Sequence, residues 1–370
     1  MFEEKNPNEG ILDEASDNII QPVWKKISLN DSVGTVLAHD ITEIRPGEFK
    51  GCAFRRGHVI KEKDICHLQR LGKEHLYILS ISDDEMHEDD AALALADCLM
   101  AEGVRMKGGP REGKITIIAE KAGLLKIHKD ALLKINMLGD VMCATLHSNT
   151  IVKTGQTVAG TRAIPLVIKK RIVEQASSIA KEANGVISVR ELRKPKAGIV
   201  ITGTEVYNGL VQDAFAPIIL KKLEAFGAEI TGVYYAPDDE GFIESRLKEL
   251  IDAGADLLIT TGGMSVDPDD TTRFAIKRLG AREIVYGSAV LPGSMFLIAY
   301  LPNNSSIREI PIIGIPACGM YSRATIFDLL LPRILAGEKI GRMELAELGH
   351  GGLCAKCDEC QYPHCPFGKI

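Results

Sequence analysis

The residues best suited to chemistry in this chain lie between positions 257 and 272, where the sequence reads LLITTGGMSVDPDDTT. A short apolar run ends in Gly262 and Gly263, and a loop with Ser265 and three acids leads into a helical pattern. A strand that turns into a helix N-terminus presents free N–H groups and the positive end of a dipole, which favours an anion. Because the nearby carboxylates would repel a bare phosphate, the composition predicts a phosphorylated ligand with Mg²⁺. The alternative is an ordinary strand–helix turn in which Asp270 only caps the helix.

A second group of reactive residues is a cysteine cluster near the C-terminus. Its spacing is C-x2-C-x2-C-x4-C-P, and its members are Cys354, Cys357, Cys360 and Cys365. In a chain without secretion signals, clustered thiolates favour a metal over disulfides. The last gap is one residue longer than in a bacterial ferredoxin run, and four thiolates equally suit tetrahedral Zn²⁺. The spacing therefore predicts Zn²⁺ or an iron–sulfur cluster, and the alternative is a tail of free thiols.

Length, composition and charge limit the remaining possibilities. The chain has 370 residues, enough for about two or three domains, and its 45% hydrophobic and 25% charged content is typical of a globular protein. A formal net charge of −6 provides no general attraction to nucleic acid or to an anionic membrane. The acidic start MFEEKNPNEG lacks a signal-peptide pattern, and no apolar run approaches the roughly 20 residues of a membrane span. We therefore expect a cytoplasmic protein.

Residues 197–336 alternate strand patterns with helical ones. The expected strands are AGIVITG, EITGVYYA, DLLITTGG, EIVYGSAV, MFLIAYL and IPIIGI, and the expected helices span 213–226, 242–253, 271–279 and 321–335. Such alternation predicts an α/β fold with a doubly wound, mostly parallel sheet. We assign this domain to residues 194–340 and a cysteine-rich, metal-binding tail to 341–370.

The region before this domain is expected to hold smaller mixed α+β accessory domains. We assign residues 1–20 to a flexible tail and residues 21–193 to the accessory region. Within it, the acidic run DDEMHEDD at 83–90 has the composition of a solvated linker, and the alternative is that part of it caps the helix expected to follow. Residues 169–183 carry apolar side chains at helical spacing and predict an amphipathic helix.

Five loops of the predicted α/β domain are rich in glycine, proline, hydroxyls and acids. They are Thr202–Glu205, Pro237–Glu240, the loop from Thr260 to Asp270, Pro292–Met295 and Gly314–Gly319. In open α/β sheets ligands bind at the carboxyl ends of the strands. We therefore expect these loops to meet at one edge of the sheet, where function concentrates.

These loops resemble motifs of a known family. ITGTEV, the PDDEG loop, LLITTGGMSVDPDDTT, the LPGS turn and IPIIGIPACG are together similar to the molybdopterin-binding domain of molybdopterin molybdenumtransferases, molybdopterin adenylyltransferases and gephyrin. More loosely, VGTVLAHDIT and FRRGHVIKEKDICHLQRLGKEHLYIL resemble the accessory domains of the molybdenumtransferase branch. The resemblance implies a molybdenum cofactor protein.

The resemblance also implies a set of site residues. The phosphate of molybdopterin, or of its adenylated form, would be held by Gly262, Gly263 and Ser265. Further walls of the site would come from Thr202, Gly203, Thr204, Pro292, Gly293, Ser294 and Pro316. In the family reaction molybdate replaces the nucleotide, and Mg²⁺ would be held by Asp270, Asp238 and Glu205.

The sequence departs from this family in two motifs of the accessory region. The MDGYA-type motif expected after VLAHDIT is replaced by EIRPGEFKGCAF, and the TGA-type motif is absent. In the family these motifs carry polar groups of the metal-insertion site, so the resemblance implies ligand binding more directly than a molybdenumtransferase reaction. It further implies a homodimer, molybdopterin and molybdate as ligands, and molybdoenzymes or adenylyltransferases as partners.

Two other interpretations stay open. TGGMSVDPDDTT also resembles the TGGLGPTPDDLT loop of the competence/damage-inducible nucleotide pyrophosphatase domain, which implies hydrolysis of a nucleotide such as ADP-ribose. A third hypothesis is a non-catalytic molybdopterin carrier or sensor. In that case the cysteine tail would report redox state or dock a molybdoenzyme.

Overall fold

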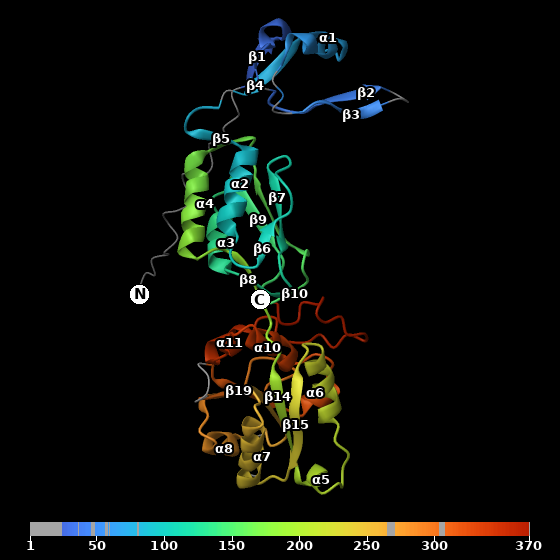
Figure 1. Ribbon diagram of the computed structural model, residues 1–370, viewed down its shortest axis with the longest axis vertical. Helices are drawn as coiled ribbons and strands as arrows, with labels where there is room; N and C mark the ends of the chain where they lie inside the picture. The colour runs from blue at the N-terminus through green and yellow to red at the C-terminus, as the bar shows by residue number, and fades with distance from the viewer. Residues whose placement is uncertain are drawn as a thin grey trace, which may run out of the picture.

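The computed structural model of the chain describes residues 24–35, 37–45, 49–55, 58, 60–79, 81–264, 271–302 and 308–369. The predicted tail at 1–20 lies outside these residues, and so do Ser265 and Asp270. Along the long axis of the molecule, an N-terminal unit is followed by a middle unit and then by an α/β domain (Figure 1).

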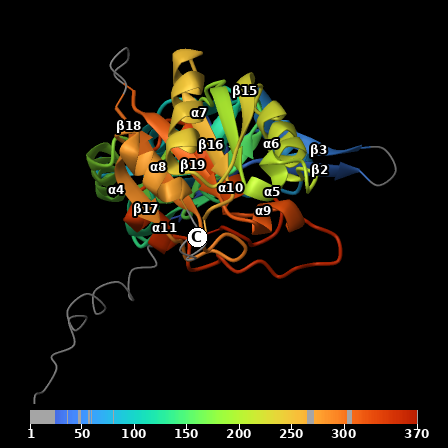
Figure 2. The same ribbon diagram turned by 90° about the horizontal axis from the view of Figure 1, so that it is seen from below.

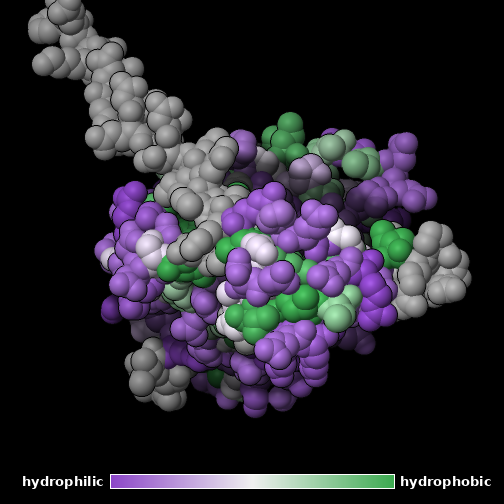
Figure 3. Space-filling model, turned by 90° about the horizontal axis from the view of Figure 1, so that it is seen from above, coloured by the Kyte–Doolittle hydropathy of each residue, from purple (hydrophilic) through white to green (hydrophobic). Residues whose placement is uncertain are grey.

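The N-terminal unit is built from two antiparallel strand pairs and one helix. β1 (Trp24–Ser28) pairs with β4 (His75–Leu79), and β2 (Ile41–Arg45) pairs with β3 (Phe49–Phe54). The short 3-10 helix η1 (Leu29–Ser32) and α1 (Glu62–Arg70) complete a small core around Leu37, Ile60 and Leu68. Seen from above, hydrophobic residues gather near the centre of a largely hydrophilic surface (Figure 3).

The middle unit packs three helices against antiparallel sheets. A four-stranded sheet has the order β6 (Val104–Met106), β7 (Lys114–Ala119), β11 (Thr157–Ala163), β9 (Val141–Thr145). A three-stranded sheet has the order β10 (Ile151–Val152), β8 (Gly123–Ile127), β13 (Ile187–Arg190). One buried core joins these sheets to α2 (Glu88–Leu99), α3 (Lys129–Asn136) and α4 (Lys170–Glu182).

The acidic run at 83–90 is ordered structure, so the linker prediction is wrong. β5 (Glu85–His87) pairs with β12 (Val167–Lys169), and α2 begins at Glu88. Lys169 Nζ lies 2.9 Å from both Asp84 Oδ2 and Glu85 Oε1. Hydrogen bonds from Lys169 lower the pKa of both carboxyls. Lys169, which is distant in the sequence, thus compensates two of the negative charges that the local sequence alone suggests are exposed to solvent.

The predicted α/β fold is confirmed. Its six-stranded sheet has the order β15 (Glu229–Ala236), β14 (Lys196–Thr202), β16 (Leu257–Thr261), β19 (Ile310–Ile315), β18 (Leu297–Leu301), β17 (Arg282–Tyr286). The first four strands are parallel, and the last two run antiparallel to their neighbours. β16 and β19 are buried along their whole length, as expected of strands covered on both faces.

Helices cover both faces of this sheet. One face packs against α6 (Phe215–Glu224), α10 (Ile326–Leu335) and α11 (Arg342–Glu347), and the other packs against α7 (Glu240–Asp252) and α8 (Thr272–Arg278). Two single-turn helices, α5 (Thr204–Tyr207) and α9 (Cys318–Tyr321), follow β14 and β19.

The predicted last helix at 321–335 begins later than expected. The chain forms α9, leaves the helical conformation, and re-enters it at Ile326. The Thr325 hydroxyl caps α10 by accepting from the Phe327 N–H, and the Thr325 N–H donates to Asp328 Oδ2, which completes a capping box. Pro332 lies within α10. Among the described residues, no helix combines the length and the apolar character needed to cross a membrane.

A buried ionic network joins the middle unit to the α/β domain. Lys126 Nζ of β8 donates to Glu338 Oε2 at 3.0 Å and to Asn149 Oδ1 at 2.7 Å. Glu338 also accepts from Arg333 of α10, with 3.1 Å between Arg333 Nε and Oε2. The Arg333 side chain is only 5% exposed. Two cations therefore depend on one carboxylate at this junction.

Candidate functional site

The carboxyl ends of four parallel strands meet at one edge of the α/β sheet. To within one residue, the register aligns the last residues of β14, β15, β16 and β19, which are Thr202, Ala236, Thr261 and Ile315. β18 runs the other way, so its first residue, Leu297, pairs with Gly314 near the same edge and brings in the loop that precedes it. This edge is the lower end of the molecule in Figure 1, and Figure 2 looks onto it. The structure thus gathers all five loops singled out in the sequence, as far as they are described.

A tight turn of two glycines closes β16 at this edge. Gly262 has φ +76° and Gly263 has φ +54°. A Cβ on Gly262 would lie 2.4 Å from the carbonyl oxygen of Thr202, and one on Gly263 would lie 2.5 Å from Thr272 Oγ1. Both the left-handed backbone and the lack of space require glycine here. The turn is therefore held directly against the end of β14 and the start of α8.

Threonine hydroxyls lock this turn from the inside. Thr202 Oγ1 donates to the carbonyl of Thr261 at 2.6 Å and lies 3.3 Å from Thr272 Oγ1. The Thr272 hydroxyl in turn donates to the carbonyl of Gly262 at 3.2 Å. Thr202 is 4% exposed, so its side chain, expected to face the ligand, points into the protein. Thr202 and Thr272 act as positioning residues for the glycine turn.

The loops after β14 and β15 are tied together by Asp238. The backbone N–H and the hydroxyl of Thr204 both donate to Asp238 Oδ2, at 2.9 and 3.0 Å. Gly203 has φ +141°, and a Cβ there would lie 3.0 Å from Glu205 Oε1. Two of the three predicted acids therefore lie at this edge, Asp238 in the loop after β15 and Glu205 in the single turn of α5. The third predicted acid is outside the described residues, and its role stays a prediction.

The predicted far side of the site consists mainly of backbone-shaping residues. Gly293 is buried with φ +133°, and a Cβ there would lie 2.4 Å from Ile326 Cγ2. Pro292 is half-buried, and its carbonyl accepts from the Ile326 N–H at 3.2 Å. Pro316 is buried and precedes α9, whereas Ser294 is exposed. Within this group, the side chain of Ser294 is the one open to a ligand.

Two further hydroxyls at this edge have no hydrogen-bond partner among the described residues. Thr261 Oγ1 and Thr271 Oγ1 are both buried, and neither finds a partner within the described parts of the chain, which exclude residues 265–270. Leaving a buried hydroxyl unpaired costs about 1–3 kcal/mol, and such groups collect at functional sites. Sequence reasoning did not single them out, although they flank the glycine loop in ITTGG and DDTT. Their position next to the turn marks the same place in the structure.

The cysteine tail forms a loop that is fixed at its base. The Cys354 N–H donates to the carbonyl of Leu291 at 2.8 Å, and the Gly368 N–H donates to that of Gly351 at 2.9 Å. The Tyr362 hydroxyl donates to the carbonyl of Asp328 at 3.0 Å. Burial, with help from Asp328 and Cys365, raises the pKa of Tyr362.

The four tail thiols are not drawn together in this conformation. Cys354 and Cys365 are half-buried against the α/β core, and Cys357 and Cys360 are exposed. Across the described residues, no group of three or more histidine, cysteine or acidic side chains is arranged to hold a metal ion. The predicted Zn²⁺ or iron–sulfur site is therefore not assembled in this conformation, and binding of a metal would have to bring the four thiols together.

Family models match two parts of the chain. Residues 198–336 match the model described as "Probable molybdopterin binding domain". Residues 26–80 match the model described as "Domain of unknown function (DUF8806)". The first match covers the strands and loops of the edge described above.

Curated relatives are similar over a shorter segment. A "CinA-like protein" of Mycobacterium avium is 41% identical over 95 residues, which make up 26% of this chain and 22% of that protein. A "CinA-like protein" of Mycobacterium tuberculosis is 40% identical over 90 residues, or 24% of this chain and 21% of that protein. The chain thus matches about a fifth of the length of these relatives.

Solved structures with a similar α/β arrangement include two proteins named MoaB. The tungsten cofactor synthesizing protein MoaB from Pyrococcus furiosus is 20% identical, with a TM-score of 0.33, and the match covers 40% of this chain and 99% of that one. The molybdopterin biosynthesis enzyme MoaB from Thermus thermophilus is 22% identical, with a TM-score of 0.32, and the match covers 39% of this chain and 98% of that one. These scores are low, so the likeness to a molybdopterin-binding domain comes from the family model that matches residues 198–336.

Proposed function

We propose that the chain binds molybdopterin, or its adenylated form, at the carboxyl edge of the α/β sheet and acts in the biosynthesis or handling of the molybdenum cofactor. The match of residues 198–336 to the molybdopterin-binding model is the observation that carries this proposal. The turn at Gly262 and Gly263 supports it, because consecutive N–H groups in a left-handed turn make a cradle for an anion. The terminal phosphate of the pterin is the group that this cradle would take.

Mg²⁺ is the metal that suits this edge. Asp238 is oriented by two donors from Thr204, and Glu205 lies in the single turn of α5. Mg²⁺ in phosphate sites is held by one or two carboxylates plus ligand oxygens, which this pair of acids with Asp270 can supply. When bound, it would neutralise charge on the phosphate. The residues of the chain itself orient the ligand and keep the phosphate against the glycine turn.

Incubation with adenylated molybdopterin, molybdate and Mg²⁺ tests the proposed function. Formation of molybdenum cofactor with release of AMP is the expected result for an enzyme of this class. Tight binding of the pterin with no turnover would instead identify a carrier or sensor. Failure to bind either pterin form would contradict the proposal.

The substitution Asp270→Asn should reduce turnover far more than binding. If Asp270 helps to hold Mg²⁺, its loss removes charge stabilisation that is realised in the transition state, and the turnover rate should fall about a hundredfold. The matched control is Asp269→Asn, which removes a neighbouring acid. Steady-state rates and pterin affinity are measured for both variants. Unchanged turnover in Asp270→Asn would show that Asp270 is a helix cap only.

The second candidate function is hydrolysis of a nucleotide pyrophosphate. The resemblance of TGGMSVDPDDTT to the loop of the nucleotide pyrophosphatase domain favours it, and this reaction would use the same phosphate cradle. The measurement is release of AMP from ADP-ribose in the absence of molybdate. Activity there, without cofactor formation from the adenylated pterin, would replace the first proposal by the second.

We also propose that the tail cysteines bind Zn²⁺ or an iron–sulfur cluster. The spacing of the four cysteines and the fixed base of their loop support this. The chain, purified anaerobically, should contain about one Zn²⁺ ion or one cluster per molecule, and Cys357→Ser should lose it. Elemental analysis and visible absorption measure the content. The control is Cys52→Ser, which removes an exposed thiol outside the tail. Wild-type protein with neither zinc nor iron would contradict this proposal.

A further inference from the structure

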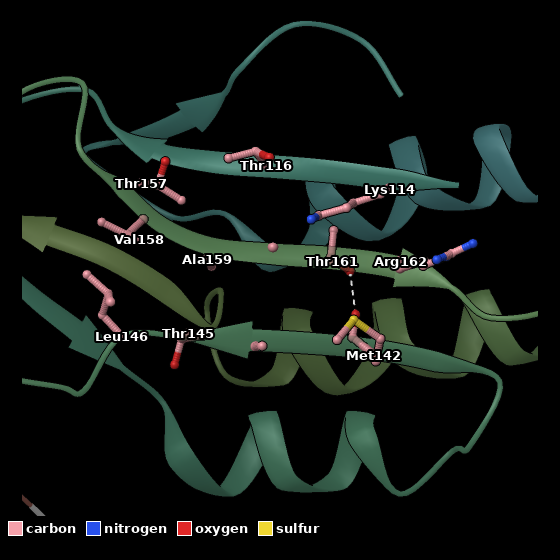
Figure 4. Close-up of a pocket in the computed structure, with 12 residues that line it drawn as sticks. Lys114, Thr116, Met142, Thr145, Leu146, Thr157, Val158, Ala159, Thr161 and Arg162 are labelled. Atoms are coloured by element: carbon pink, nitrogen blue, oxygen red, sulfur yellow. Dashed lines mark hydrogen bonds between the residues drawn. The ribbon is translucent and has the colours of Figure 1, made fainter. Parts of the chain in front are cut away.

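A concavity of about 470 Å³ lies in the middle unit, on the face of the sheet formed by β7, β11 and β9 (Figure 4). α2 and α3 pack against the opposite face, where alternate residues such as Ile117 and Cys143 join the core. We call this concavity the middle-sheet trough and define it by Lys114, Thr116, Met142, Ala144, Gly160 and Arg162. It belongs to a different sheet from the carboxyl edge of the α/β domain.

The floor of the trough is made of small residues. The register places Gly160 between Thr116 of β7 and Ala144 of β9. A Cβ on Gly160 would fit without collision, because its nearest neighbours, the Ile115 carbonyl oxygen and Lys114 Cε, would lie 3.8 Å away. No side chain rises from the floor at this position. Leu146 extends the lining toward one end of the trough (Figure 4). This floor can accept a flat apolar group.

The other end of the trough carries two adjacent cations. Arg162 pairs in register with Lys114 on one side and with Met142 on the other, and the three side chains share this end (Figure 4). Like charges opposite each other in an antiparallel pair destabilise a sheet. In the part of the chain that the structure describes, neither cation has a side-chain partner, and Arg162 Nε is buried without a hydrogen bond. An anion at this end would offset the repulsion between the two cations.

We infer that the middle-sheet trough is a binding site for a small organic oxyanion with a flat apolar body. The oxyanion lies between Lys114 and Arg162, where the planar guanidinium can donate two hydrogen bonds to it. The body packs on Gly160 and Ala144. This inference does not depend on the function proposed for the α/β domain.

Phenyl phosphate is the probe, because it joins an oxyanion to a flat apolar ring. Calorimetric titrations use the full chain and its Gly262→Ala variant, in which the phosphate cradle of the α/β edge is disrupted, so that binding to the two sites can be told apart. We expect phenyl phosphate to bind both forms at the trough. Lys114→Gln and Arg162→Gln should each weaken this binding about tenfold or more, as expected for loss of a charge-assisted hydrogen bond. Gly160→Val, which fills the floor, should abolish it.

The matched control is Lys134→Gln, which removes an exposed cation from α3 and should leave binding unchanged. Far-UV circular dichroism verifies that each variant folds. If Gly160→Val does not fold, Lys114→Gln still tests the inference, because Lys114 is exposed and its substitution should not disturb folding. Inorganic phosphate should bind about tenfold more weakly than phenyl phosphate, since it lacks the ring. Binding that is lost in Gly262→Ala, or that is insensitive to Lys114→Gln and Arg162→Gln, would overturn the inference.

Discussion

Gly262→Ala is expected to weaken pterin binding by about tenfold or more, the equivalent of at least 1.4 kcal/mol. The added Cβ would lie 2.4 Å from the carbonyl oxygen of Thr202 and 2.6 Å from its Oγ1, closer than packed atoms can approach. Thr202 cannot yield easily, because its hydroxyl is bound to the carbonyl of Thr261 at 2.6 Å. The turn itself must therefore move, and the N–H groups proposed to hold the phosphate move with it. Anaerobic titration with molybdopterin measures the change.

The control for this variant is Gly254→Ala. Gly254 also has a left-handed backbone, with φ +91°, but a Cβ there would meet no atom within 4 Å. It therefore reproduces the backbone strain of the substitution, about 1–2 kcal/mol, without the collision. Equal losses of pterin affinity in both variants would show that the close approach of Gly262 to Thr202 has no part in the site.

Glu338→Gln is expected to lower the free energy of unfolding by about 3 to 5 kcal/mol, the usual effect of removing one partner from a buried ionic group. Glu338 is the acid shared by Lys126 and Arg333, and their side chains are only 22% and 5% exposed. Without it, two partly or fully buried cations face each other, and Arg333 already has one unpaired nitrogen. Denaturant unfolding followed by far-UV circular dichroism measures the loss.

The pH dependence of this effect has a definite sign. Burial alone raises the pKa of Glu338, but Arg333 and Lys126 outweigh burial and hold it below the ordinary value of 4.5. Burial lowers the pKa of Lys126. Its one acid partner, Glu338, raises this pKa but does not outweigh burial. A carboxylate with a lowered pKa stabilises the fold above its unfolded pKa, and this contribution is lost as the pH falls through the folded pKa. The difference between wild type and variant should be full at pH 7 and should shrink below pH 4.5.

Glu102→Gln is the matched control. Glu102 pairs with Lys121 at 2.6 Å, but its side chain is 84% exposed, so water replaces the lost partner. It should change stability far less than Glu338→Gln. A similar small effect in both variants would contradict the idea that the junction of the middle unit and the α/β domain depends on Glu338.

The sequence alone determined the architecture of the α/β domain. Strands such as β16 and β19 are continuous apolar runs because both of their faces are buried, and the helices between them carry one apolar stripe each. These are local patterns that a single pass along the chain can detect. The meeting of the loops at one edge then follows from the parallel direction of the strands. The family resemblance rests on the same loops.

Only the tertiary structure decided what individual polar side chains do. Thr202 and Thr204 are two residues apart in ITGTE, yet the first hydroxyl turns inward to Thr261 and the second reaches outward to Asp238. The acidic run at 83–90 contains a strand because β5 pairs with β12, about 80 residues away in the sequence, and Lys169 of β12 pairs with Asp84 and Glu85. The cation pair of the middle-sheet trough depends on the register of two strands. In each case the partner is distant in the sequence. Whether a polar side chain is stabilised or destabilised depends on the neighbour that the fold places beside it, which local sequence patterns do not show.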